Sequence, residues 1–163
     1  MRIRQVRTED AAEMLEIYAP LVEDTAISFE LSPPSIDVFT ERIESYSKTH
    51  EWLVVENSVG VVGYAYVTPH RAREAYRHSV EASVYIKEGF RARGLGKQLY
   101  TELFARLKKK EFHSAYAGIA LPNESSEALH QSVGFSKIGV FHEVGYKHGK
   151  WHDVSWWQRD IKK

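Results

Sequence analysis

The alternation of apolar and polar residues along the chain predicts a series of short strands. Over residues 79–86 the two classes alternate, which is typical of a strand with one buried face. Two apolar runs, 52–56 and 61–67, flank turn residues 57–60, and this pattern predicts a hairpin. The complete set of expected strands is 2–6, 52–56, 61–67, 79–86 and 115–121, with two more around residues 145–150.

Helices are expected between these strands. Thr8 is the expected N-cap of the first helix, because acidic residues follow it, and Pro20 is expected to end that helix. Apolar residues at helical spacing predict a second helix over 35–46. Leucines at every fourth position make 94–110 the clearest helix, and a fourth is expected over 123–133.

The composition is that of a globular protein, and it narrows the chemistry. The 163 residues are 43% hydrophobic, so we expect a single α+β domain, residues 1–163. The absence of cysteine excludes a disulfide scaffold, a thiolate zinc site and a cysteine nucleophile. Because 22 basic and 22 acidic side chains cancel, neither nucleic acid nor a membrane is expected as a partner. The polar N-terminal segment is unlike a signal peptide and no apolar run would span a bilayer, so we expect a cytoplasmic protein.

The most informative segment is a glycine-containing loop before the clearest helix. Gly94 and Gly96 let the backbone approach a ligand, and the free N–H groups of a helix start attract an anion. Arg91 and Arg93 add positive charge at the same place. A Walker loop is excluded because arginine, not glycine, stands six residues before Lys97. From these residues alone, an anion-binding loop and an arginine-rich helix start without a ligand are equal alternatives.

The pattern Arg-x-x-Gly-x-Gly after a strand is similar to the pyrophosphate loop of GNAT-type N-acetyltransferases. Further blocks, in unbroken order, resemble the branch of that family that acetylates phosphinothricin, methionine sulfoximine and methionine sulfone. These blocks are residues 52–54, 72–76, 79–86, 121–124 with 129–130 and 134–135, and 145–154. The resemblance implies the GNAT acyl-CoA N-acyltransferase fold, a central mixed, mostly antiparallel, twisted sheet flanked by about four helices. It also implies acetyl-CoA as co-substrate and a homodimer that uses the C-terminal strands.

The same resemblance implies which residues contact the cofactor. The pantetheine arm is expected to pair with the strand at 84–86, and the pyrophosphate to lie against the glycine-containing loop. The implied cofactor-binding residues are Val84, Tyr85, Ile86, Arg91, Ala92, Arg93, Gly94, Leu95, Gly96, Lys97, Asn123 and Ser132.

Glu81 and His130 are the candidate catalytic residues. Strand geometry places Glu81 on one face with Ser83, where a carboxylate beside a ligand can accept a proton from an amine. The alternative is a solvated residue or an ion-pair partner for an arginine. Helical spacing places His130 on one face with Asn123 and Ser126. Much of the family has tyrosine where this chain has His130, so the roles stay open: Glu81 as base with His130 as acid, or His130 as both.

Arg71, Arg73 and Tyr76 are the candidate substrate residues, in a basic loop before the strand at 79–86. Guanidinium groups pair in a bidentate manner with carboxylate, phosphinate or sulfone oxygens. The resemblance implies that this loop faces an amino-acid substrate and that Phe29 covers it, whereas the family often has lysine in place of Arg71. The alternative is a solvated surface loop.

No metal site is expected, because His148 and His152 lie in a turn without a third ligand at zinc spacing.

The loop, the resemblance and the candidate residues together predict an enzyme that transfers acetyl from acetyl-CoA to the α-amino group of a small amino acid or analogue, directly within a ternary complex. The alternatives are a protein N-terminal or polyamine acetyltransferase and a non-catalytic acyl-CoA-binding sensor. The basic loop counts against a polyamine, and retention of both Glu81 and His130 counts against a sensor.

Overall fold

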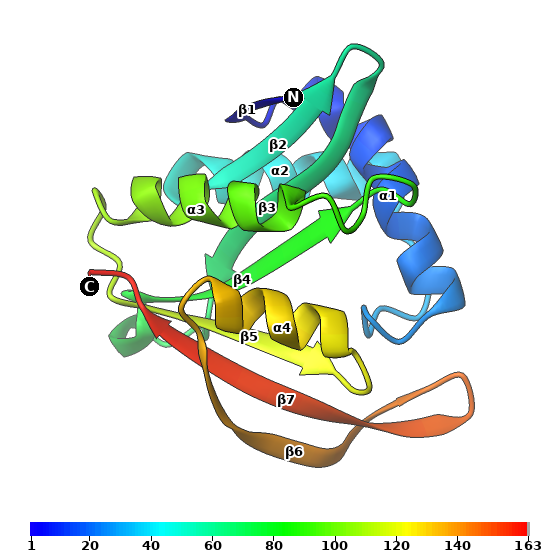
Figure 1. Ribbon diagram of the computed structural model, residues 1–163, viewed down its shortest axis with the longest axis vertical. Helices are drawn as coiled ribbons and strands as arrows, with labels where there is room; N and C mark the ends of the chain where they lie inside the picture. Colours follow the sequence, from blue (N-terminus) through cyan, green and yellow to red (C-terminus); the bar gives the residue numbers. More distant parts are fainter. Residues whose placement is uncertain (163) are drawn as a thin grey trace.

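The computed structural model describes residues 1–162; Lys163, the last residue of the predicted domain, lies outside the described residues. Residues 1–162 form a seven-stranded sheet in the order β1-β2-β3-β4-β5-β7-β6 (Figure 1). Neighbouring strands are antiparallel except β4 and β5, which run parallel. The strands are β1 (Arg2–Gln5), β2 (Trp52–Asn57), β3 (Gly60–Pro69), β4 (Ser79–Ile86), β5 (Ser114–Ala120), β6 (Ser136–Lys147) and β7 (Lys150–Asp160). The predicted mixed, mostly antiparallel sheet is confirmed.

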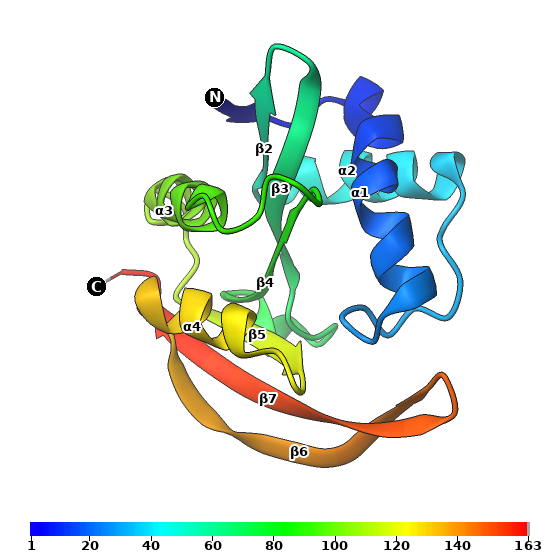
Figure 2. The ribbon, with the colours of Figure 1, turned by 45° about the vertical axis from the view of Figure 1, so that its right-hand side comes forward.

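Helices cover both faces of this sheet. Within the described residues they are α1 (Ala11–Asp24), α2 (Ile36–Thr49), α3 (Leu95–Leu107) and α4 (Glu124–Ser132), with short 3-10 helices η1 (Thr8–Asp10) and η2 (Glu74–Tyr76). Figure 2 shows α1 and α2 on one side of β2 and β3 and α3 on the other side, while α4 lies along β5. No helix within residues 1–162 is long and apolar enough to cross a membrane.

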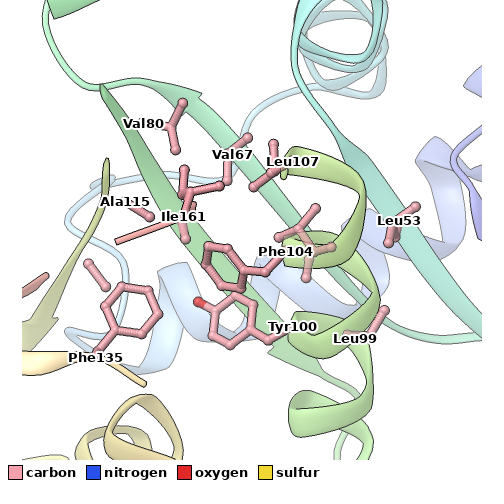
Figure 3. Close-up of a cluster of buried hydrophobic side chains, with 14 of the residues drawn as sticks. Leu53, Val67, Val80, Leu99, Tyr100, Phe104, Leu107, Ala115, Phe135 and Ile161 are labelled. Atoms are coloured by element: carbon pink, nitrogen blue, oxygen red, sulfur yellow. The ribbon is translucent and has the colours of Figure 1, made fainter. Parts of the chain in front are cut away.

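Each face has its own apolar core. On the α3 face, Leu99 and Leu107 are fully buried and pack in one cluster with Val67 of β3 (Figure 3). On the opposite face, Met14 of α1 packs in a second cluster with Trp52 of β2. The four-residue leucine spacing therefore identified the buried face of α3 correctly.

The first helix differs from its prediction at both ends. Thr8 opens η1 and does not cap α1, because the carboxylate of Asp10 accepts the backbone N–H of Arg7 at 2.7 Å and closes this turn first. Pro20 lies inside α1, which continues for another turn. Proline costs one backbone hydrogen bond, but Leu21 and Val22 just after it are buried, and their burial offsets this loss.

The sheet opens between β4 and β5. Their parallel pairing joins Ser79, Val80 and Glu81 to β5, and no pairing between the two strands continues beyond Glu81. Figure 1 shows the two strands diverging from this point. The remaining part of β4 is still paired with β3 along its other edge. From Glu81 onward, the edge of β4 that faces β5 therefore has no strand partner.

Candidate active site

Cavities follow β4 along this opening. The first, here the Glu81 cavity, has a volume of about 400 Å³, and its lining includes Glu81, Ser83, Tyr85, Phe29 and Trp156. Next to it lies a small cavity of about 60 Å³, here the His130 cleft, lined among others by Ser83, Tyr85, Tyr100, Asn123 and His130.

The third, here the loop cavity, has a volume of about 490 Å³ and borders the glycine-containing loop. The Glu81 cavity shares Ser83 and Tyr85 with the His130 cleft. The His130 cleft in turn shares Tyr85 and Asn123 with the loop cavity. The cavities therefore form one path along β4, from Glu81 past His130 to the loop.

Glu81 lies on the face of β4 that the alternation predicted. Val80 and Ala82 belong to the α3-side core, whereas Glu81 faces the opposite side and lines the Glu81 cavity. Its Oε2 lies 3.1 Å from Nδ1 of His70, and its side chain is 34% exposed. A carboxylate at this position is open to a ligand on one side and held by an imidazole on the other.

His130 is buried at the inner face of α4, and both of its ring nitrogens are bonded. Nδ1 lies 2.7 Å from the carbonyl oxygen of Ser126, and Nε2 lies 2.9 Å from the hydroxyl of Tyr100. A carbonyl only accepts, so Nδ1 carries the proton and Nε2 accepts from Tyr100. Burial lowers the pKa of His130, and the bond to Ser126 opposes this only in part. The imidazole is therefore neutral at physiological pH and acts as an acceptor.

Tyr100 is a site residue that the sequence analysis missed. It lies on α3 among leucines, and Figure 3 shows it beside Phe104 in the apolar core. Burial raises the pKa of its hydroxyl, which lines the His130 cleft and donates to His130. The one signal in the sequence was the phenolic hydroxyl of Tyr100, a polar group on the otherwise apolar face of α3.

The loop cavity gathers most of the predicted cofactor residues. Those lining it are Val84, Tyr85, Ile86, Arg91, Ala92, Gly94, Leu95, Gly96, Lys97 and Asn123. Gly94 has φ +79° and serves as the N-cap of α3, and no side chain caps the first turn. The N–H groups of that turn are thus open to an anion.

Two details fix the shape of this cavity. The Nε of Arg91 donates to the carbonyl oxygen of Ile86 at 3.0 Å, which holds the guanidinium beside β4. A Cβ on Gly96 would lie 3.0 Å from Cδ2 of Leu129, so a larger residue here would require the Leu129 side chain of α4 to shift. The open helix start, the basic side chains and the free edge of β4 fit the pyrophosphate and the extended amide arm of acetyl-CoA.

Two predicted cofactor residues do not line the loop cavity. Ser132 is exposed near the end of α4, and its hydroxyl donates to the carbonyl oxygen of Leu129 at 2.7 Å. The guanidinium carbon of Arg93 lies 5.2 Å from the centre of the Phe90 ring. Phe90 itself lines the cavity, so Arg93 contacts a residue of the cavity wall without lining the cavity.

The predicted substrate residues are divided between two places. Phe29, in the segment between α1 and α2, lines the Glu81 cavity as expected. Arg71, Arg73 and Tyr76 line a separate hollow of about 570 Å³ together with His70. The structure therefore does not gather the two arginines and Phe29 around one cavity; His70, bonded to Glu81, connects the hollow to the Glu81 cavity.

The C-terminal hairpin supplies a wall that the sequence analysis did not predict. The residues contributed by β6 and β7 to the Glu81 cavity are Phe141, Val144, Val154 and Trp156. The ring of Trp156 lies close to β5, since a Cβ on Gly118 would be 3.1 Å from it.

A polar network fastens the segment that carries Phe29. On one side the hydroxyl of Tyr18 bonds Ser28 at 2.7 Å and also bonds Glu30, which in turn pairs with Arg42. On the other side Lys147 of β6, only 2% exposed, donates to the carbonyl oxygen of Ser28 at 2.6 Å. Burial lowers the pKa of the Lys147 ammonium. Phe29 is thus held between α1 and the C-terminal hairpin.

The two histidines near 150 are His148 and His152, in the turn and the second strand of the β6–β7 hairpin. The Nε2 of His152 lies 3.0 Å from the carbonyl oxygen of Lys147, and His148 occupies the hairpin turn with φ +53°. Among residues 1–162 no group of three or more His, Cys, Asp or Glu side chains is arranged to hold a metal ion.

Comparison with known proteins agrees with this geometry. Residues 3–156 match the family of acetyltransferase (GNAT) domains. The chain is 36% identical to a phosphinothricin N-acetyltransferase of Streptomyces viridochromogenes over 99% of this chain and 88% of that protein. It is 31% identical to an L-methionine sulfoximine/L-methionine sulfone acetyltransferase of Pseudomonas aeruginosa, over 98% and 94% of the two chains.

A solved structure has the same fold. The phosphinothricin acetyltransferase of Sinorhizobium meliloti in complex with acetyl-CoA superimposes with a TM-score of 0.93 at 34% identity, over 98% of this chain and 87% of that one. The expected GNAT fold is confirmed, and with it the transfer of acetyl from acetyl-CoA. The chain belongs to the GNAT family of N-acetyltransferases.

Proposed function

We propose that this enzyme acetylates the α-amino group of a small amino acid or analogue of the phosphinothricin, methionine sulfoximine or methionine sulfone type. The observation that carries the proposal is the continuous path along β4, which joins the Glu81 carboxylate to the loop cavity. The full-length relatives acetylate compounds of this type according to their names. Residues 1–163 act as one N-acetyltransferase domain in this proposal.

Acetyl-CoA would enter from the loop side. The open first turn of α3, with Arg91 and Lys97 beside it, would hold the pyrophosphate. The arm would extend along β4 at residues 84–86, on the edge that β5 leaves free. The thioester would then lie at the His130 cleft, close to Tyr100 and the backbone of β4.

The amine would lie in the Glu81 cavity and react there directly. Glu81 takes one proton from the substrate ammonium, and the free amine attacks the thioester carbonyl carbon. Backbone N–H groups of β4 near Val84 stabilise the oxyanion. The carbon–sulfur bond then breaks, and the departing thiolate takes the second proton that the nitrogen loses. In this proposal the hydroxyl of Tyr100 gives its proton to the sulfur and takes up the proton that the nitrogen loses, and His130, the hydrogen-bond acceptor of this hydroxyl, orients it. The acetyl group would thus pass directly within a ternary complex, and the chain has no cysteine that could form a thioester acyl-enzyme.

Substrate size would be set by Phe29 and the wall from β6 and β7. Guanidinium groups of Arg71 and Arg73 would attract the acidic end of the substrate from the adjoining hollow. A polyamine, which is positively charged, would be repelled by these two guanidinium groups. Resistance to phosphinothricin-like compounds would follow from such activity in a cytoplasmic enzyme.

A homodimer is part of the proposal. The β6–β7 hairpin exposes more than half of several large apolar side chains: Ile138, Phe141, Val144, Tyr146 and Trp151. A second copy of this hairpin would cover such a surface. Sedimentation of the purified chain as a dimer, and of Trp151→Glu as a monomer, would support this part; a wild-type monomer would contradict it.

A thiol-release assay tests the substrate class. Purified enzyme is given acetyl-CoA with L-phosphinothricin, L-methionine sulfoximine, L-methionine sulfone, spermidine or a short peptide with a free N-terminus. We expect thiol release with the amino-acid analogues, and NMR of the products should show acetylation at the α-nitrogen. Release with spermidine or the peptide alone would favour the alternatives, and binding of acetyl-CoA without release would favour a sensor.

A further inference from the structure

His70 is the partner that the structure gives to the proposed base. It follows the end of β3, and its Nδ1 lies 3.1 Å from Oε2 of Glu81. In the sheet register Glu81 stands opposite Thr68 of β3 and Tyr116 of β5. Residues opposite one another in a sheet share a face, and His70, two residues after Thr68, falls on that face too.

The imidazole of His70 is held from several directions. Its ring stacks on Tyr116, with ring centres 4.7 Å apart and planes inclined by 24°. Tyr76 approaches it edge-on at 5.7 Å. The backbone N–H of His70 donates to the carbonyl oxygen of Ser79 at 3.2 Å. With a side chain only 14% exposed, His70 has a defined orientation toward Glu81.

We infer that His70 is a positioning residue for Glu81. A carboxylate only accepts hydrogen bonds, so Nδ1 of His70 donates to Oε2 and fixes the rotation of the carboxylate. The second oxygen is then left to accept the proton when an N–H bond of the substrate ammonium breaks, while His70 keeps its own proton. This inference rests on the proposed role of Glu81 and adds the group that orients it.

His70 also joins two parts of the site. Glu81 lines the Glu81 cavity, whereas His70 lines the hollow that contains Arg71, Arg73 and Tyr76. Tyr76 belongs to η2 in the same loop and touches the His70 ring. The segment expected to attract the substrate is therefore in contact with the residue that orients the base.

Matched variants separate hydrogen bonding from packing. His70→Phe keeps a ring that can stack on Tyr116 but removes the N–H donor. His70→Asn loses the ring but places an amide nitrogen close to the position of Nδ1. His50→Phe is the control, because His50 also packs against an aromatic ring, that of Phe112 at 5.0 Å, outside all the cavities described above. Steady-state kcat and the KM for acetyl-CoA are measured for each, with Glu81→Gln alongside and circular dichroism to verify folding.

We expect His70→Phe to lower kcat about tenfold at an unchanged KM for acetyl-CoA, because a carboxylate free to rotate is a poorer base. His70→Asn should recover most of this loss, and His50→Phe should match wild type. A wild-type kcat in His70→Phe beside a slow Glu81→Gln would overturn the positioning role and leave Glu81 as base. Equal losses in His70→Phe and His70→Asn would overturn it too. An unimpaired Glu81→Gln would instead remove the proposed base, and with it this inference.

Discussion

The hydroxyl of Tyr100 donates to Nε2 of His130 across 2.9 Å, while the opposite ring nitrogen donates to the carbonyl of Ser126. The histidine predicted as a catalytic acid therefore has no free N–H to offer. Both Tyr100 and His130 line the same cleft. In the proposed mechanism Tyr100, whose hydroxyl carries the proton of this pair, is therefore the group that protonates the departing sulfur.

The first prediction concerns this pair. Tyr100→Phe removes the hydroxyl and leaves a buried Nε2 without a donor, which costs about 1–3 kcal/mol of stability. It should also lower kcat by roughly 100-fold or more, since a positioned proton donor contributes about 10²- to 10⁴-fold. Chemical denaturation and steady-state kinetics measure the two effects. A stable Tyr100→Phe enzyme with wild-type kcat would remove Tyr100 from the proton path.

The second prediction is the pH dependence of stability. Burial lowers the pKa of His130 below its ordinary value of 6.5, so the unfolded chain binds this proton more readily than the folded chain. The contribution of neutral His130 to the free energy of unfolding is then complete above the pKa that this histidine has in the unfolded chain. It is lost as the pH falls through the lower pKa of the folded chain. Burial acts on the pKa of His50 in the same direction.

We therefore expect the free energy of unfolding to decrease from about pH 7.5 to about pH 5.5. His130→Asn should show a shallower decrease over this interval, because one of the two histidines no longer titrates. Urea denaturation at a series of pH values gives both slopes. Identical slopes for the two proteins would contradict the burial of a neutral imidazole.

The third prediction concerns the wall formed by Phe29. A Cβ on Gly145 would lie 2.3 Å from Cε2 and 2.5 Å from Cζ of the Phe29 ring, so Gly145→Ala must displace that ring. We expect the KM for the amine to rise roughly 10-fold, with the KM for acetyl-CoA unchanged. Gly139→Ala, on the same strand with no atom within 4 Å of its Cβ, is the matched control. An unchanged KM for the amine in Gly145→Ala would mean that Phe29 does not bound the substrate.

Sequence patterns within a single helix or strand predicted those parts of the site that lie on one segment of the chain. The side of β4 that carries Glu81 follows from two-residue periodicity, and the start of a helix at the glycine-containing loop follows from the leucine spacing after it. Pro20 shows the opposite case, because the packing of Leu21 and Val22 outweighs a local helix breaker.

The parts that depend on distant segments could not be predicted in this way. Tyr100 has the spacing of a core residue, and only the approach of α4 turns its hydroxyl into a partner of His130. The separation of Arg73 from the Glu81 cavity depends on the path of a loop, which no periodicity specifies. Trp156 enters the cavity because β7 pairs with β5 in a register that sets Trp156 opposite Gly118.

The central claim is that Glu81 takes a proton from an amino-acid amine at the opening between β4 and β5. Its most direct test is the rate of thiol release from acetyl-CoA with L-methionine sulfoximine, for wild type and Glu81→Gln at saturating acetyl-CoA. We predict acetylation of the α-nitrogen by wild type, a rate at least about 100-fold lower for Glu81→Gln, and the same KM for acetyl-CoA in both. Equal rates in the two proteins would contradict the account.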